Sequence, residues 1–289
     1  MQTASRFLST DPARVSARSE AAFFGALKTA NNTFKSTATG RLATIDQAII
    51  RRLDAAGAQP RRVLDLGISS GVTTLELAQA LWRSGRPVAV TGTDRSMTGY
   101  LVDLPWGCRA LVEPGGHILQ YDLRGVPLRP WNRRLDYVTG MALVRRLVDR
   151  QLAPRARARL GVRRACSPVP LVSPRLARAG GVELVEDDIA VANCRFAGRF
   201  ELIRAANILN RHYFSDAGLE AAVCNVRSYL AGAGSWLAVV RTHGGGDHRG
   251  TLFRMNDAGG LDPVERWGGG SEVEAEFLSA PVSSGGATR

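Results

Sequence analysis

The sequence predicts an α/β fold in which helices cover both faces of a doubly wound, mostly parallel sheet. Two β-prone runs, at residues 62–67 and 87–93, flank a glycine-rich turn and a segment of helical composition at 72–82. Strand, helix and strand at this spacing form a right-handed βαβ unit of a parallel sheet. The 289 residues are 45% hydrophobic and 22% charged, which is globular composition and excludes a disordered, collagen-like or disulfide-scaffold chain.

The N-terminal part is expected to form an arm followed by a helix. Residues 1–40 are polar apart from the pair Phe23 and Phe24, and we predict a loose helical arm there. From residue 42 to residue 53, apolar residues recur at every third or fourth position, which predicts an amphipathic helix that Gly57 and Pro60 end. The main domain is therefore expected at 41–281, with a disordered tail at 282–289.

The alternation of strands and helices resumes after residue 182. The expected elements are strands at 182–186, 200–203 and 235–240, a helix at 217–230, and an antiparallel edge pair at 251–255 and 273–278.

Residues 100–168 are too long for one crossover helix, so they are expected to be an insertion or cap between the second and third strands. The segment holds three of the five tyrosines, two of the five tryptophans and a short strand candidate at 118–121. A helix there has an apolar stripe at Val144, Val148 and Leu152, backed by Leu143 and Leu147, with arginines opposite. We expect a substrate lid, with core packing or contact with an anionic membrane as alternatives.

The charge and cysteine content limit the class of protein. The net charge is +12, but 36 of the 38 basic residues are arginine, which a GC-rich genome produces without a polyanionic partner. No apolar run of about 18 residues occurs, which argues against a membrane-spanning helix. Four cysteines without a Cys-x-x-Cys pair argue against a zinc site or a disulfide framework and favour the cytoplasm.

The glycine-rich turn after the first strand is expected to bind a cofactor, because backbone N–H groups and a helix N-terminus meet there without a Cβ in the way. A phosphate-binding loop needs a lysine after Gly71, and none is present. A dinucleotide site needs glycine where Ser69 stands and a third glycine within 72–74.

The run Val63-Leu64-Asp65-Leu66-Gly67-Ile68-Ser69-Ser70-Gly71, followed by Asp94 at the end of the next strand, resembles the class I S-adenosylmethionine-dependent methyltransferases. Residues 200–214 are loosely similar to the chemotaxis-receptor methyltransferases. The resemblance covers residues 42–99 and 170–280. It implies a seven-stranded, Rossmann-like sheet with one reversed strand inserted at its edge.

The resemblance also implies the site residues. Asp94 matches the carboxylate that accepts two ribose hydroxyls, and Asp187 and Asp188 match the acidic position that meets the adenine amino group. Asp122, after strand candidate 118–121, is a rival for the adenine role. The expected cofactor-binding residues are Asp65, Gly67, Ser69, Gly71, Asp94, Asp187, Asp188 and Ala206, and no metal is expected.

The acceptor is expected at the end of the fourth strand, where Arg204, Asn207, Asn210, His212 and Tyr213 lie. His212 and Asn207 are the catalytic candidates. The chain has no Asn/Asp-Pro-Pro-aromatic motif of amino-methylating nucleic-acid enzymes, so we expect methyl transfer to oxygen or nitrogen of a small or lipid-like molecule (EC 2.1.1.-). The alternatives are an RNA methyltransferase and a non-catalytic regulatory protein that binds S-adenosylmethionine.

Overall fold

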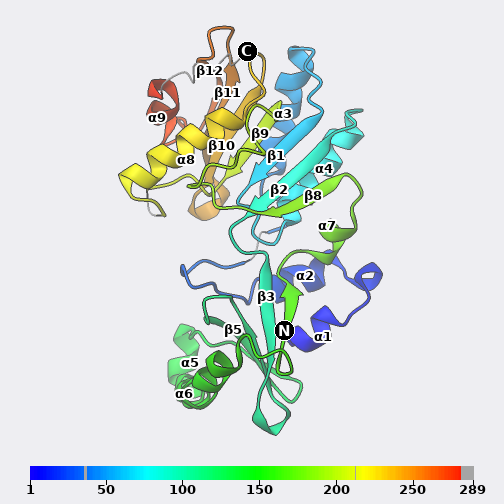
Figure 1. The fold of residues 1–289 in the computed structure, drawn as a ribbon, viewed down its shortest axis with the longest axis vertical. Helices are drawn as coiled ribbons and strands as arrows, with labels where there is room; N and C mark the ends of the chain where they lie inside the picture. Colours follow the sequence, from blue (N-terminus) through cyan, green and yellow to red (C-terminus); the bar gives the residue numbers. More distant parts are fainter. Residues whose placement is uncertain (36–37, 212, 281–289) are drawn as a thin grey trace. The chain divides into compact units, whose positions relative to one another are not determined.

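The computed structural model describes residues 1–35, 38–211 and 213–280. By their internal contacts the residues divide into two units (Figure 1). Unit 1 comprises residues 1–39, 69–72 and 96–178, and unit 2 comprises residues 40–68, 73–95 and 179–289. The predicted tail at 282–289 lies outside the described residues.

Unit 2 is built on a sheet that has seven strands within the described residues, in the order β12-β11-β10-β9-β1-β2-β8. The strands β8, β2, β1, β9 and β10 pair in parallel, whereas β11 runs antiparallel to both of its neighbours. The predicted seven-stranded, mostly parallel sheet with one reversed strand is therefore confirmed. The strands span Arg62–Leu66 (β1), Ala89–Asp94 (β2), Val182–Glu186 (β8), Leu202–Ala206 (β9), Trp236–Thr242 (β10), His248–Met255 (β11) and Leu261–Trp267 (β12).

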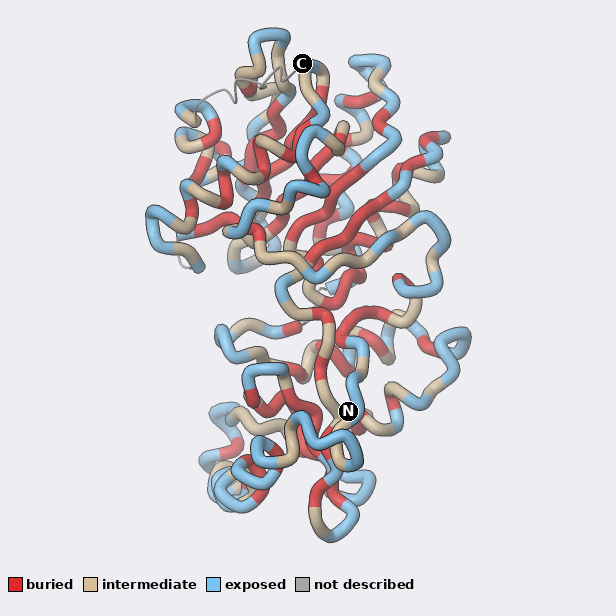
Figure 2. The backbone as a smooth tube through the Cα atoms, in the orientation of Figure 1, coloured by how far each residue is buried: buried red, intermediate tan, exposed pale blue. Residues whose placement is uncertain are grey.

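Helices cover both faces of this sheet because successive strand side chains point to opposite faces. On one face, α3 (Ala43–Ala55) and α4 (Val72–Arg83) pack their apolar sides on Val63 and Leu202. On the other face, α8 (Asp216–Tyr229) and α9 (Glu274–Ser279) pack on Leu64 and Ile203, and the short helix η3 (Gly244–Gly246) follows β10. Figure 2 shows buried residues along the central strands, as two-sided packing requires.

The predicted strand at 273–278 is wrong, because this segment forms α9. Val273 and Phe277 are both fully buried and stand four positions apart, which is helical spacing. The edge strand is instead β12, which contains Pro263. An edge strand tolerates proline, and the β11–β12 register shifts between Leu252 and Phe253, next to the pair that Phe253 makes with Pro263.

Unit 1 holds a second sheet, antiparallel throughout, whose five strands within the described residues have the order β6-β5-β4-β3-β7. Of these, the sequence predicts only residues 118–121. Its elements are β3 (Thr98–Asp103), β4 (Arg109–Val112), β5 (Ile118–Leu123), β6 (Val126–Leu128), β7 (Cys166–Pro170), α1 (Ala4–Leu8), η1 (Pro12–Arg14), α2 (Ala17–Phe24), η2 (Pro105–Gly107), α5 (Arg134–Val138), α6 (Met141–Arg159) and α7 (Pro174–Arg178).

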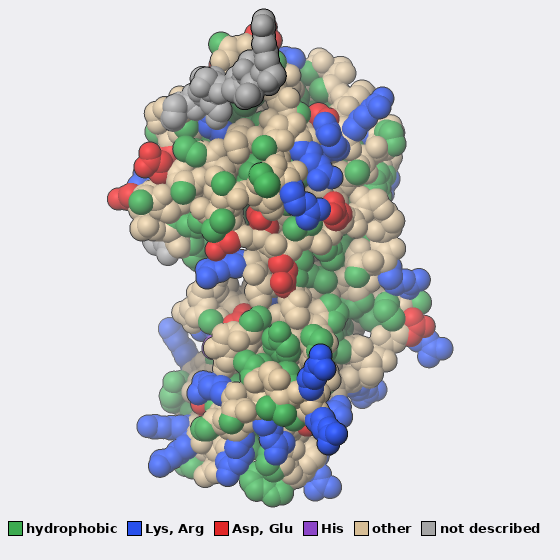
Figure 3. Space-filling view, in the orientation of Figure 1, with side chains coloured by type: hydrophobic (Ala, Val, Ile, Leu, Met, Phe, Trp, Pro, Cys, Tyr) green, Lys and Arg blue, Asp and Glu red, His purple; other side chains and the backbone are tan. Residues whose placement is uncertain are grey.

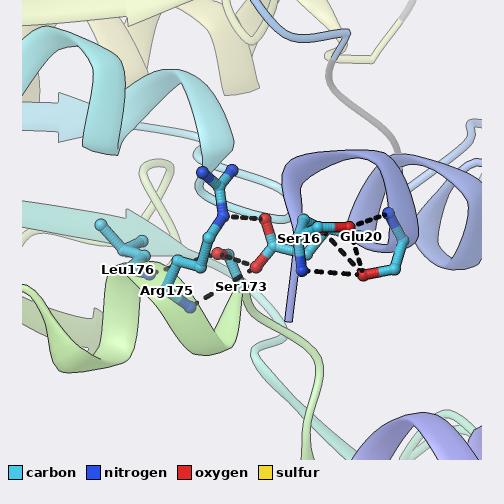
Figure 4. A network of polar contacts seen from close by, with 6 residues as sticks. Ser16, Glu20, Ser173, Arg175 and Leu176 are labelled. Atoms are coloured by element: carbon cyan, nitrogen blue, oxygen red, sulfur yellow. Dashed lines mark hydrogen bonds and ion pairs between the residues drawn. The ribbon is translucent and has the colours of Figure 1, made fainter. Parts of the chain in front are cut away.

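The N-terminal residues belong to the core of unit 1. The rings of Phe7 and Phe23 stack 4.0 Å apart, and both side chains pack in one cluster with Leu111 and Leu119 of the antiparallel sheet. The sequence predicts a loose arm at 1–40 and a separate insertion at 100–168. In the structure, residues from both segments pack into one core. The fully buried Glu20 of α2 also accepts hydrogen bonds from Ser173 and Arg175, which ties α2 to the start of α7 (Figure 4).

Helix α6 packs on the antiparallel sheet, but only part of its predicted apolar stripe is buried there. Leu152 and Ala153 are buried against the sheet, but the side chains of Leu143 and Leu147 are 63% and 55% exposed. Among the described residues, no helix is both long and apolar enough to cross a membrane.

Candidate functional site

The carboxyl ends of the central parallel strands bring several predicted site residues of unit 2 to one edge of the sheet. After β1 the chain turns at Gly67, and the backbone N–H groups of Gly67 and Ile68 both donate to the Thr93 carbonyl of β2, at 2.8 and 3.0 Å. Strand β2 ends at Asp94, whose carbonyl accepts from the Asp187 N–H after β8 at 3.0 Å. In an open α/β sheet, ligands bind at this edge.

The turn after β1 has the backbone conformation that the predicted motif requires. Gly67, Ser69 and Gly71 all have positive φ angles, of 70°, 57° and 76°. A serine in the left-handed region is uncommon, so the turn keeps a glycine conformation although Ser69 carries a Cβ. By contacts Ser69 and Gly71 belong to unit 1, where the Lys35 ammonium donates to the carbonyls of Ser69 and Ser96.

Gly67 is required by packing within unit 2. A Cβ on Gly67 would lie 2.8 Å from Cδ1 and 2.9 Å from Cβ of Ile208, the second residue after β9. The missing side chain therefore lets the segment after β9 approach the turn.

The Asp65 carboxylate is bound by Arg204, and the Asp65 side chain is buried. Arg204 lies on β9, and its guanidinium donates to both Asp65 carboxylate oxygens at 2.8 and 2.7 Å and to Asp46 of α3 at 2.7 Å. Thr74 of α4 donates to Asp65 at 2.6 Å. The prediction that Arg204 faces an acceptor is wrong, because Arg204 is fully buried in this cluster. Any effect of Asp65 on a cofactor acts through the position of β1 and α4.

The cluster contains two carboxylates and one guanidinium. Burial opposes the charge of Arg204, but Asp46 and Asp65 outweigh it and raise the pKa of Arg204, so this side chain stays charged. Burial raises the pKa of Asp46 above its usual range, although Arg204 opposes that shift.

The two predicted adenine-contacting carboxylates differ in their surroundings. Asp188 accepts a hydrogen bond from the Ala190 N–H at 3.1 Å, and its other oxygen pairs with Arg95 at 3.5 Å. One oxygen of Asp187 accepts from the Asn193 side chain at 2.8 Å, and the other is buried with no donor among the described residues. A buried carboxylate oxygen without a donor is costly unless a ligand supplies one, so of these two carboxylates Asp187 is the one with an unmade hydrogen bond. The rival Asp122 lies on β5 of unit 1, where it accepts from Gly125.

Asn207 follows β9 with a positive φ of 62° and braces the end of β10. Its Oδ1 accepts from the Thr242 N–H at 2.7 Å, and its Nδ2 donates to the Thr242 hydroxyl at 3.4 Å. That hydroxyl also lies 3.2 Å from Nδ1 of His248, the residue paired with Thr242 across β10 and β11. His212, the other catalytic candidate, lies outside the described residues.

The structure thus adds His248 to the site. In the sequence His248 stands in a glycine-rich stretch at 243–250, and the pairing of β10 with β11 that brings it beside Thr242 is not visible there. Among the described residues, no group of three His, Cys, Asp or Glu side chains could hold a metal ion. Ala206, at the end of β9, is nearly buried, and its predicted cofactor contact stays a prediction.

No protein-family model matches the sequence, and no curated protein matches it significantly. Solved structures do resemble the chain. The N-methyltransferase NodS from Bradyrhizobium japonicum WM9, in complex with S-adenosyl-L-homocysteine, is 14% identical, with a TM-score of 0.35 over 74% of this chain and 68% of that one. CalS10, an S-adenosylmethionine-bound amino pentose methyltransferase from Micromonospora echinaspora, is 16% identical, with a TM-score of 0.32 over 68% of this chain and 49% of that one.

The CMeT domain of the citrinin polyketide synthase is 15% identical, with a TM-score of 0.34 over 69% of this chain. This chain spans only 35% of the length of that one. NodS and CalS10 are methyltransferases by name.

Proposed function

We propose that the chain is a methyltransferase that takes its methyl group from S-adenosylmethionine. One observation carries the proposal: Asp187, which follows β8, has a buried carboxylate oxygen without a donor among the described residues, and its backbone N–H donates to the carbonyl of Asp94 at the end of β2. The resemblance assigns Asp94 to the ribose and Asp187 to the adenine, and the hydrogen bond between their backbones supports that assignment. The Gly67 turn at the end of the neighbouring strand β1 supports the same site.

The residues present fit the cofactor in a specific way. Asp94 would accept hydrogen bonds from the two ribose hydroxyls, because a carboxylate can accept two at once. The free oxygen of Asp187 would accept one from the adenine amino group. Bound S-adenosylmethionine would supply an activated methyl group on a sulfonium, and its neutral thioether leaving group needs no acid.

The polar residues after β9 and β10 would serve the acceptor. Asn207 holds the end of β10 and could not change its hydrogen bonds without moving Thr242. His248 is half-buried, and its Nδ1 lies 3.2 Å from the Thr242 hydroxyl. In the tautomer whose Nδ1–H donates to that hydroxyl, Nε2 has the lone pair that would take a proton from an acceptor. We propose oxygen or nitrogen of a small or lipid-like molecule as the acceptor and the cytoplasm as the location.

The proposal is tested by incubating the purified protein and labelled S-adenosylmethionine with lipid, small-molecule and RNA fractions of a cell extract. We expect label in the lipid or small-molecule fraction, and none with the Asp94→Ala variant. His248→Gln should lower the rate at saturating cofactor more than it changes cofactor affinity, whereas the exposed Arg195→Gln variant should do neither.

An RNA acceptor is the second candidate, and the basic charge of unit 1 favours it. Label found in RNA, with turnover that falls steeply as salt rises, would support RNA methylation. Cofactor binding without labelled product in any fraction would support a regulatory protein that binds S-adenosylmethionine.

A further inference from the structure

The net charge of the chain lies almost entirely in unit 1. This unit has 20 Lys and Arg residues against 7 Asp and Glu residues, a net charge of +13. Unit 2 has 18 against 19, a net charge of −1. Arginine is frequent in both units, as a GC-rich genome would produce, but only in unit 1 is it unmatched by acidic residues. The charge imbalance is therefore a property of unit 1 alone, and genome composition does not explain it.

Exposed apolar side chains lie among these arginines on α5 and α6. Leu135 and Val138 of α5 are 73% and 84% exposed, and Tyr137 between them is 70% exposed. On α6, Leu143, Val144 and Leu147 are also exposed. We call these six residues the α5–α6 apolar edge. Soluble proteins seldom leave so many large apolar residues of two adjacent helices in water.

Basic residues stand next to this edge at helical spacing. Arg146 and Arg150 each follow an edge leucine by three positions, so they share its side of α6, and both are exposed. Arg133 and Arg134 precede the edge on α5 and are exposed as well. In Figure 3, Lys and Arg side chains gather over the part of unit 1 that holds these helices.

A cavity of about 440 Å³ in unit 1 is lined by Arg129, Arg133, Arg145 and Trp131. Asp136 pairs with the guanidinium groups of Arg129 at 2.6 Å and Arg145 at 2.8 Å, and it also accepts from the Arg133 backbone N–H at 2.6 Å. Arg145 is only 7% exposed, and burial together with Arg129 lowers its pKa. The guanidinium groups of Arg129 and Arg133 lie 4.7 and 5.3 Å from the Trp131 ring. Three guanidinium groups against one carboxylate thus leave net positive charge at this cavity, which would suit an anion of phosphate size.

We propose that the α5–α6 apolar edge and the arginine cavity bind unit 1 to an anionic lipid surface. The leucines and valines enter the boundary between headgroups and acyl chains, the exposed arginines contact lipid phosphates, and the cavity takes one phosphate headgroup. RNA would use the arginines and exposed aromatic rings but has no use for aliphatic side chains such as Val138 and Leu143. The mixture of aliphatic and basic side chains is what favours lipid.

The test is flotation of the full-length protein with vesicles of phosphatidylcholine alone and of phosphatidylcholine mixed with phosphatidylglycerol. We expect binding only to the mixed vesicles, weakening as salt rises. Replacing one exposed arginine, as in Arg146→Gln, should weaken binding about fivefold, the fold-change of about 1 kcal/mol per basic residue.

A double variant, Leu143→Ser with Leu147→Ser, should weaken binding about tenfold or more, because both side chains lose their burial in lipid. The matched control is Val191→Ser, which removes a 64% exposed apolar side chain of unit 2 and should leave binding unchanged. Unchanged circular dichroism shows that the double variant is folded.

The Arg133→Gln variant tests the cavity. A separate competition with excess inorganic phosphate tests the apolar edge: because the edge contributes to binding, phosphate should not release the protein from the vesicles. Equal binding to both vesicle types, no binding to either, or full binding by the folded double variant would overturn the proposal. Binding to RNA but not to vesicles would do the same and would assign the charge to nucleic acid. None of these results depends on cofactor binding, so they leave the proposed function untouched.

Discussion

The guanidinium of Arg204 forms two parallel hydrogen bonds with the carboxylate of Asp65, across two adjacent strands of the parallel sheet. Both side chains are buried, and the same guanidinium reaches Asp46 on α3 and the Thr73 carbonyl on α4. One arginine therefore joins two central strands and two helices beside the turn at Gly67. This arrangement fixes the strand that positions the candidate cofactor site.

Replacing Arg204 with methionine should lower the free energy of unfolding by about 3–5 kcal/mol, because two buried carboxylates lose their counter-charge. Urea unfolding followed by circular dichroism measures this change. Arg195→Met is the matched control, since Arg195 is exposed in the same unit, and it should change stability by less than about 0.5 kcal/mol. Equal stability of the two variants would show that the cluster contributes little.

Asp46→Asn should alter the pH dependence of stability in a defined direction. Burial raises the pKa of Asp46 in the folded state, so below that raised value the folded protein binds a proton that the unfolded chain does not yet bind. The native protein should therefore gain stability relative to Asp46→Asn as the pH falls toward about 4, the ordinary value of an unfolded carboxyl. Unfolding free energies of both proteins between neutral and acidic pH measure the difference, and a difference independent of pH contradicts the account.

Gly67→Ala should destabilise the protein more than Gly57→Ala does. Both glycines have positive φ angles, of 70° and 61°, so both alanines pay the cost of the left-handed region. Only at position 67 would the new Cβ also collide with Ile208, whereas position 57 has open space. We expect losses of about 2–4 kcal/mol for Gly67→Ala and at most about 1 kcal/mol for Gly57→Ala. Thermal unfolding of both variants measures this, and equal losses would show that Ile208 moves aside without cost.

The sheet of unit 2 is largely predictable because its elements carry strong local signals. Residues 182–186, with Val182, Leu184 and Val185, form β8 as predicted, and the strand at 87–93 is shifted only slightly in β2. The segment at 273–278 misleads because Val, Glu, Ala and Glu in turn imitate alternation, while Val273 and Phe277 in fact share one helix face. A short segment of this kind fits both periods, and tertiary packing decides between them.

The antiparallel sheet of unit 1 is less predictable because its strands are short and carry few β-branched residues. Strand β6 has three residues, and β7, with the sequence CSPVP, includes two prolines. Strand β7 is stabilised by its pairing with β3 and by packing against α1 and α2, which are distant from β7 in the sequence. The amphipathic stripe on α6 also misleads, since Leu152 is buried whereas Leu143 and Leu147 are not.

The candidate site is likewise predictable from the sequence only in part. Gly67 and Asp187 directly follow strands and Asp94 ends one, so the sequence predicts all three at one sheet edge. That Arg204 binds Asp65, and that His248 meets Thr242, depends on pairings between strands that no local pattern encodes. The difference between Asp187 and Asp188 depends on individual hydrogen bonds, which only coordinates reveal.

The most direct test is calorimetric titration with S-adenosylmethionine and S-adenosylhomocysteine of the native protein and of Asp94→Ala, Asp187→Ala and Asp188→Ala. We predict binding by the native protein and a loss of at least about tenfold for Asp94→Ala and Asp187→Ala, since each removes an acceptor from a ligand donor. Asp188→Ala should lose less than about threefold, because Ala190 and Arg95 already occupy its oxygens. Absence of binding in folded native protein, or native affinity in Asp94→Ala, would contradict the proposed cofactor site.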